Sequence, residues 1–163
     1  MSEQKFELIV ASIEAVCQQG PPTVEQPSSP PTIRIHADDL LTVAVHLHEH
    51  PDLLFDMLSC ITGIDNGPEQ GTMEVIYTLC SIPHEFQVNL RIVLSRDDLV
   101  APSICTVWRS ANWLEREIFD LYGIHFSNHP DLRRILLPED WEGHPLRKDY
   151  VHQTHYRDIE VKY

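Results

Sequence analysis

Residues 110–124 read SANWLEREIFDLYGI, and they specify a short helix with both ends marked. Asn112 is a preferred residue before a first helical turn, and Glu115 three positions later completes the pattern of a capping box. Gly123 suits the left-handed residue that follows a last turn. We therefore predict a helix over residues 113–122.

This helix has an apolar side and a charged side. Four apolar side chains recur at helical spacing: Leu114, Ile118, Leu121 and Tyr122. Arg116 and Asp120 lie four residues apart and are expected to pair on the other side. A solvated, self-paired face is one interpretation. An exposed pair contributes only about 0–1 kcal/mol, so charges this dense beside Trp113 and Phe119 also fit a protein–protein contact.

Composition limits the classes of function. The chain has 163 residues and a formal net charge of −13. A body this acidic would be repelled by nucleic acid and by an anionic membrane surface. Two basic pairs, Arg133–Arg134 and Arg147–Lys148, lie in the less acidic C-terminal part. They form either a solvated loop or a segment that docks on an acidic partner.

No motif for a cofactor or a catalytic nucleophile is recognisable. The four cysteines, at positions 17, 60, 80 and 105, lack zinc or iron–sulfur spacing and are expected to be buried, reduced thiols. The histidines at 46, 48 and 50 are expected to be solvated, and the pair at 125 and 129 is not expected to bind metal. The sequence contains no Gly-rich phosphate loop in a strand–turn–helix context. These observations oppose a free-standing enzyme.

The chain divides into residues 1–31, with a helix and a Pro-rich linker, a domain at 32–137, and an extended tail at 138–163. Further elements follow from apolar spacing and turn residues: a helix over 4–18, a strand at Thr32–His36, a helix carrying Leu40, Val43, Ala44 and Leu47 and capped by Asp38 or Asp39, a short helix over Leu53–Ile61, and strands at Met73–Cys80 and Phe86–Leu94. This order predicts an α+β fold, a mainly antiparallel sheet with helices on one face. The tail has no period and needs a partner surface to be ordered.

Two strings resemble one known family. Glu-Arg-Glu-x-x-Asp-Leu-Tyr at residues 115–122, followed by His129 and Arg133, resembles the signature of the thirty-kilodalton subunit family of respiratory complex I. Residues 143–150, GHPLRKDY, look like that family's second motif. Two long motifs in the right order make a chance match unlikely.

The resemblance implies a subunit of the peripheral arm of a proton-translocating NADH–quinone oxidoreductase, without catalytic residues, flavin, cluster or nucleotide of its own. FMN, iron–sulfur clusters and quinone are expected in partner subunits. The implied partners are the large, forty-nine-kilodalton (D-type) subunit and cluster-bearing neighbours of the B and I types. The implied location is the cytoplasmic face of the inner membrane, reached only through the complex. The expected interface residues are Trp113, Glu115, Arg116, Glu117, Asp120, Tyr122, Arg133, Arg134, His144, Pro145, Arg147, Lys148, Asp149 and Tyr150.

A second function stays open at this point. Membrane-bound hydrogenases and quinone oxidoreductases fed by ferredoxin reuse the same domain, so the chain is alternatively the equivalent assembly module of such a complex. The string at residues 143–150 favours the quinone-linked group.

Overall fold

A computed structural model describes residues 3–25, 29–157 and 159–160. The predicted N-terminal segment, linker and tail also include residues 1–2, 26–28, 158 and 161–163, which lie outside the described residues.

The centre of the fold is a five-stranded sheet with the order β1-β2-β5-β4-β3. Its long strands are β3 (Met57–Asp65), β4 (Thr72–Ser81) and β5 (Phe86–Ser95), and its short strands are β1 (Thr23–Glu25) and β2 (Thr32–Arg34). β4 pairs antiparallel with β3 and β5, while β2 runs parallel to β5. Because side chains alternate along a strand, Val75, Tyr77 and Leu79 of β4 all point into the core. The predicted hairpin and α+β class are confirmed.

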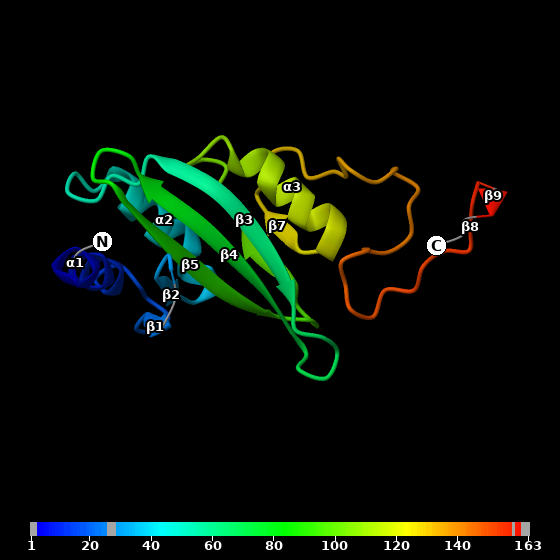
Figure 1. Ribbon diagram of the computed structural model, residues 1–163, viewed down its shortest axis with the longest axis horizontal. Helices are drawn as coiled ribbons and strands as arrows, with labels where there is room; N and C mark the ends of the chain where they lie inside the picture. The colour runs from blue at the N-terminus through cyan, green and yellow to red at the C-terminus, as the bar shows by residue number, and fades with distance from the viewer. Residues whose placement is uncertain (1–2, 26–28, 158, 161–163) are drawn as a thin grey trace.

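Helices flank this sheet. α2 (Leu40–Glu49) lies behind it in Figure 1, and α3 (Ala111–Tyr122) contacts β3. α1 (Glu3–Glu14) packs against α2, which follows the short 3₁₀ helix η1 (Ala37–Asp39). The four predicted apolar residues of α2 are fully buried. Asp39 does not cap α2 with its side chain. Its carboxylate accepts the backbone N–H groups of Gln18 and Gln19, just after α1.

The predicted helix over Leu53–Ile61 is wrong, because most of that range belongs to strand β3. Leu53 and Phe55 are buried ahead of the strand, and Leu58, Ile61 and Gly63 then face the core. Pairing with β4 along the whole strand overrides the local helical spacing. The first helix is also shorter than predicted, since α1 ends at Glu14.

Two short parallel strands frame α3. β6 (Val100–Pro102) precedes the helix and β7 (His125–Ser127) follows it. Beyond β7 the chain is extended up to a two-stranded hairpin of β8 (His155–Tyr156) and β9 (Ile159–Glu160) (Figure 1). Among the described residues, no helix is long and apolar enough to cross a membrane.

Candidate functional site

The signature helix α3 buries most of its charge instead of showing it to solvent. Glu115, Arg116 and Asp120 are buried, whereas Glu117 is exposed. The helix begins at Ala111 and ends, as predicted, on Gly123 with a left-handed φ of 75°. The predicted capping box is wrong: Ser110 precedes the helix without a side-chain cap, and Glu115 bonds elsewhere.

The predicted pair of Arg116 and Asp120 is also wrong. Arg116 donates from Nε to the carbonyl oxygen of Arg133 at 3.2 Å, and its Nη1 lies 3.8 Å from a carboxylate oxygen of Asp131. Its guanidinium sits 4.9 Å from the ring centre of Trp113. The chain that follows β7 crosses α3, and its residues bind Arg116 in place of a partner within the helix.

Asp120 organises this crossing. Its Oδ2 accepts the backbone N–H groups of Ile135, Leu136 and Leu137 at 3.0, 2.8 and 3.0 Å. Its Oδ1 accepts Nη1 of Arg134 at 2.7 Å. Burial alone would raise the pKa of Asp120, but these hydrogen bonds and the guanidinium outweigh it and lower the pKa. The ionised carboxylate of Asp120 therefore binds the segment after β7 through several hydrogen bonds at once.

Residues 129–150, which we call the strap, stay attached to the C-terminal end of α3. Arg134 donates to the carbonyl oxygens of Trp141 and Gly143 at 3.1 and 3.0 Å. Nδ1 of His144 lies 2.9 Å from the carbonyl oxygen of Asp120, and Nε of Arg147 donates to that of Tyr122 at 2.6 Å. The strap therefore satisfies carbonyl groups that a helix end leaves free.

A second buried carboxylate holds the end of the strap. Oδ2 of Asp65, at the end of β3, accepts the backbone N–H of Lys148 at 2.7 Å. Arg96 lies 3.3 Å from Asp65 and 2.6 Å from Asp149. Burial acts to raise the pKa of Asp65, but the N–H groups of Lys148 and Gly67 and the charge of Arg96 bring it below the usual value. Part of the predicted tail thus finds a surface on its own domain.

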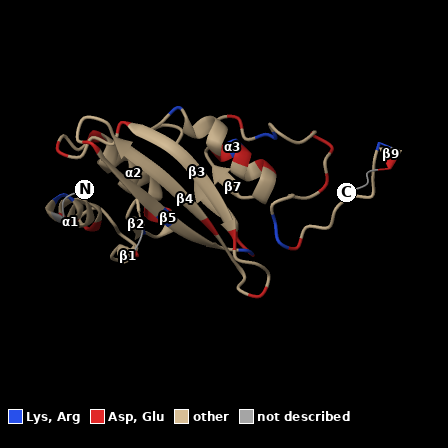
Figure 2. Ribbon diagram, in the orientation of Figure 1, with Lys and Arg blue, Asp and Glu red and all other residues tan. Residues whose placement is uncertain are grey.

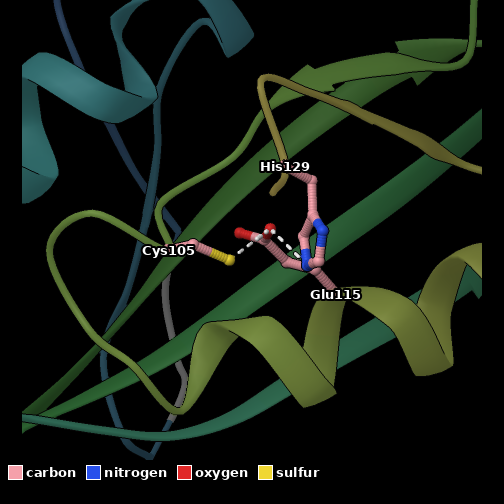
Figure 3. A group of neighbouring side chains, drawn as sticks. All are labelled: Cys105, Glu115 and His129. Carbon is pink, nitrogen blue, oxygen red and sulfur yellow. Dashed lines mark hydrogen bonds and ion pairs between the residues drawn. The ribbon is translucent and has the colours of Figure 1, made fainter. Parts of the chain in front are cut away.

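Glu115 occupies a different environment in the first half of α3. Its carboxylate accepts Oγ of Ser103 at 2.6 Å, the N–H of Ile104 at 2.8 Å and Sγ of Cys105 at 3.3 Å. Nε2 of His129 lies 3.9 Å away (Figure 3). Burial outweighs these partners and raises the pKa of Glu115. It also raises the pKa of the Cys105 thiol to about 12.

Several predicted interface residues remain at the surface. Trp113 is 62% exposed, and Glu117, Arg133, Lys148 and Asp149 are exposed as well. Pro145 and Tyr150 are half-buried in the strap, and the half-buried ring of Tyr122 packs closely on Gly63. Figure 2 shows acidic residues along α3 and basic residues at several places in the chain that follows. Contact of these residues with a partner stays a prediction.

Sequence spacing missed Asp65, Arg96, Ser103 and Cys105. Asp65 carries a local signal, because its carboxylate accepts the N–H of Gly67 in a turn. Arg96 reaches it from another strand end, which no local pattern encodes.

The expected states of the cysteines and histidines are partly corrected. Cys80 is buried and Cys17 and Cys105 are half-buried, but Cys60 is exposed, because it lies on the outer side of β3; all four are free thiols. His46 and His48 are half-buried and hydrogen-bonded to Ser12 and to the carbonyl oxygen of Phe55. Packing of α1 and residue 55 against α2 shields these two rings in part, and His50 is half-buried as well.

A family model for the respiratory-chain NADH dehydrogenase 30 Kd subunit matches residues 33–156. The chain belongs to this family. The C-type subunit of the NADH-quinone oxidoreductase of Chlorobium phaeobacteroides is 43% identical over 131 residues, which cover 79% of this chain and 78% of the relative. The corresponding protein of Trichlorobacter lovleyi is 43% identical over 119 residues, which cover 72% of each chain.

Two solved structures share the fold of this member of the complex I thirty-kilodalton family. A trypsin-resistant fragment of Nqo5 superposes with a TM-score of 0.61 at 25% identity, covering 78% of this chain and 99% of the fragment. A chain of the membrane-bound sulfane sulfur reductase, an archaeal respiratory membrane complex, gives a TM-score of 0.73 at 22% identity, covering 90% of this chain and 86% of that one. The second likeness shows that the fold is shared.

Proposed function

We propose that this chain is a structural subunit of the peripheral arm of a proton-translocating NADH–quinone oxidoreductase, and that it carries no flavin, nucleotide or iron–sulfur cluster. The observation that carries the proposal is the family match over residues 33–156, which spans nearly all of the domain and the whole strap. The protein supports electron transfer from NADH to quinone by holding its neighbours in place. The redox groups, FMN, iron–sulfur clusters and quinone, belong to partner subunits.

The proposed docking surface consists of α3 and the strap, and the proposed main partner is the large, forty-nine-kilodalton subunit. Trp113, Leu136 and Leu146 are 62%, 59% and 48% exposed on these two segments. Large exposed apolar side chains beside charged ones fit the centre and rim of a protein interface. The strap's hydrogen bonds to α3 arrange much of this surface before a partner binds, which lowers the entropic cost of association.

The proposed location is the cytoplasmic face of the inner membrane. The acidic composition, with a net charge of −13, opposes direct binding to anionic lipid. Attachment through the other subunits of the complex, including cluster-bearing neighbours of the B and I types, is consistent with that charge.

Replacing Trp113 and Leu136 together with Ser tests the docking surface. We expect a lower yield of assembled complex and normal NADH–quinone turnover per assembled complex. The matched control is Ile82→Ser, which changes a side chain 64% exposed at the β4–β5 turn. A normal yield with lost turnover would show a role in the chemistry instead of assembly.

The alternative function is the equivalent module of a membrane-bound hydrogenase or of a ferredoxin-fed quinone oxidoreductase. The fold is shared with a chain of a different respiratory complex, the archaeal membrane-bound sulfane sulfur reductase, and this likeness keeps the alternative open. Purification of the native complex separates the two: an NADH-binding flavoprotein among the co-purifying subunits supports the first proposal, and a hydrogenase subunit or a ferredoxin-accepting subunit supports the second.

A further inference from the structure

We propose that Cys105, Glu115 and His129 form a binding site for a divalent transition-metal ion such as Zn²⁺. One sulfur, one oxygen and one nitrogen atom from these side chains all lie within 4.8 Å of one another. They come from three segments: the loop before α3, α3 itself and the chain after β7 (Figure 3). The inference is independent of the proposed function, and it departs from the sequence-based expectation of no metal.

The buried carboxylate of Glu115 favours a bound cation. Its side chain is 0% exposed, and across the described parts of the chain the ion-pair partner found for it is His129, itself 0% exposed and charged only when protonated. A buried carboxylate is costly unless it is neutralised by a proton, a cation or a metal ion. A divalent ion bound to one thiolate, one carboxylate and one neutral imidazole gives a site with no net charge.

The types of donor atom and their spacing suit zinc. Sulfur, imidazole nitrogen and carboxylate oxygen are the donors that zinc prefers in proteins. A tetrahedral site with ordinary zinc bond lengths places neighbouring donor atoms about 3.3–3.6 Å apart. Sγ of Cys105 and Nε2 of His129 lie 3.3 and 3.9 Å from the same oxygen of Glu115. Small side-chain movements therefore bring the three donors to coordination distance.

A buried phenol lies in the same region of the core. The hydroxyl oxygen of Tyr77 is buried and has no hydrogen-bond partner among the residues that the structure describes. Burial and, in addition, the charge of Glu115 raise the pKa of Tyr77, so the two groups lie within electrostatic reach. An unpartnered buried hydroxyl is costly.

Binding requires a defined rearrangement at His129. Its Nε2 now lies 3.1 Å from the carbonyl oxygen of Asn112, and its Nδ1 accepts the N–H of Asp131 at 3.0 Å. Coordination through Nε2 moves the imidazole proton to Nδ1 and opens both contacts. The Nδ1–H group then requires an acceptor in place of the N–H of Asp131. The thiol proton of Cys105 is released to solvent.

Cobalt substitution tests the site in the purified full chain. After removal of adventitious metal with a chelator, the protein is titrated with Co²⁺, and bound metal is counted after gel filtration. We expect about one ion per chain, together with a near-ultraviolet thiolate-to-cobalt charge-transfer band. Cys105→Ser and His129→Gln should remove the band and the tightly bound ion.

Matched controls exclude binding by other thiols and histidines. Cys60→Ser, Glu117→Gln and His125→Gln change exposed residues of the same three types outside the proposed site, and they should keep the band. Circular dichroism shows whether each variant is folded, and Cys105→Ser is the mildest of the site variants. Absence of a thiolate–cobalt band in the folded wild-type chain, or an unchanged band in Cys105→Ser, would overturn the proposal.

Discussion

The two halves of α3 bury carboxylates whose pKa values are shifted in opposite directions. The side chains of Glu115 and Asp120 are both fully buried on this one helix, yet the pKa of Glu115 is raised and that of Asp120 is lowered. Asp120 accepts three backbone N–H groups and a guanidinium, whereas Glu115 has one N–H, a hydroxyl and a thiol. Four donors, one of them a guanidinium, lower the pKa of Asp120, whereas burial with fewer donors raises that of Glu115.

The largest expected effect comes from Asp120→Ala. Removing one member of a buried charged network costs about 3–5 kcal/mol of unfolding free energy, because Arg134 and three N–H groups lose their acceptor. Urea denaturation measures the loss, and hydrogen exchange should show the amides of residues 135–137 unprotected. Glu117→Ala, an exposed change on the same helix, should stay within about 0.5 kcal/mol. Equal losses in both variants would contradict the assigned role of Asp120.

Gly123→Ala tests the close approach of the strap at the Asp120 end of the helix. Gly123 has φ of +75°, and an added Cβ would meet the side chains of His144 and Arg147. The left-handed conformation alone costs a non-glycine residue about 1–2 kcal/mol. Gly71→Ala is the matched control, with φ of +64° and open space around its Cβ position. We expect Gly123→Ala to lower the urea midpoint further than Gly71→Ala, and equal shifts would show that the strap simply moves aside.

Glu115→Gln distinguishes the contributions of the two carboxylates to the pH dependence of stability. The fold favours protonated Glu115, so in the wild type its contribution falls as pH rises from the ordinary pKa of 4.5 through the raised folded value. The fold favours ionised Asp120, whose contribution is present above the ordinary pKa of 3.8 and is lost as pH falls through the lowered folded value. Glu115→Gln should lose the pH dependence of stability that comes from Glu115 and keep the one that comes from Asp120. The free energy of unfolding should change by about 1 kcal/mol. Thermal melting at several pH values, with chelator present, measures this; an unchanged slope above pH 4.5 would contradict it.

The smallest effect is expected from deleting residues 151–163. Val151 and Ile159 are 84% and 68% exposed, and the ion pair of Arg157 with Asp140 is at the surface. The truncated chain should keep its unfolding free energy within about 0.5 kcal/mol.

Deleting residues 138–163 instead should still leave a folded domain, but one with lower stability and impaired co-purification with the large subunit. It removes the bonds of the strap to Asp65 and to the end of α3. A longer truncation that melts and assembles like the shorter one would show that the strap does not contribute.

The sequence by itself determined a helix over residues 113–122 with its glycine stop, the apolar face of α2 and the β4–β5 hairpin, because each depends on a local pattern of apolar and turn residues. It also identified the family, since the two motifs are long. The irregular course of the tail was equally visible, because no apolar period runs through it.

Only the tertiary structure decided where the charges of α3 go. Arg116 and Asp120 have helical spacing for a pair, but backbone N–H groups and Arg134 from a segment crossing the helix offer Asp120 more and better-placed donors. Strand β3 likewise followed from pairing with β4 rather than from its own spacing. The cluster of Cys105, Glu115 and His129 has no sequence signature, because residues distant in the chain converge only when β6, α3 and β7 pack together.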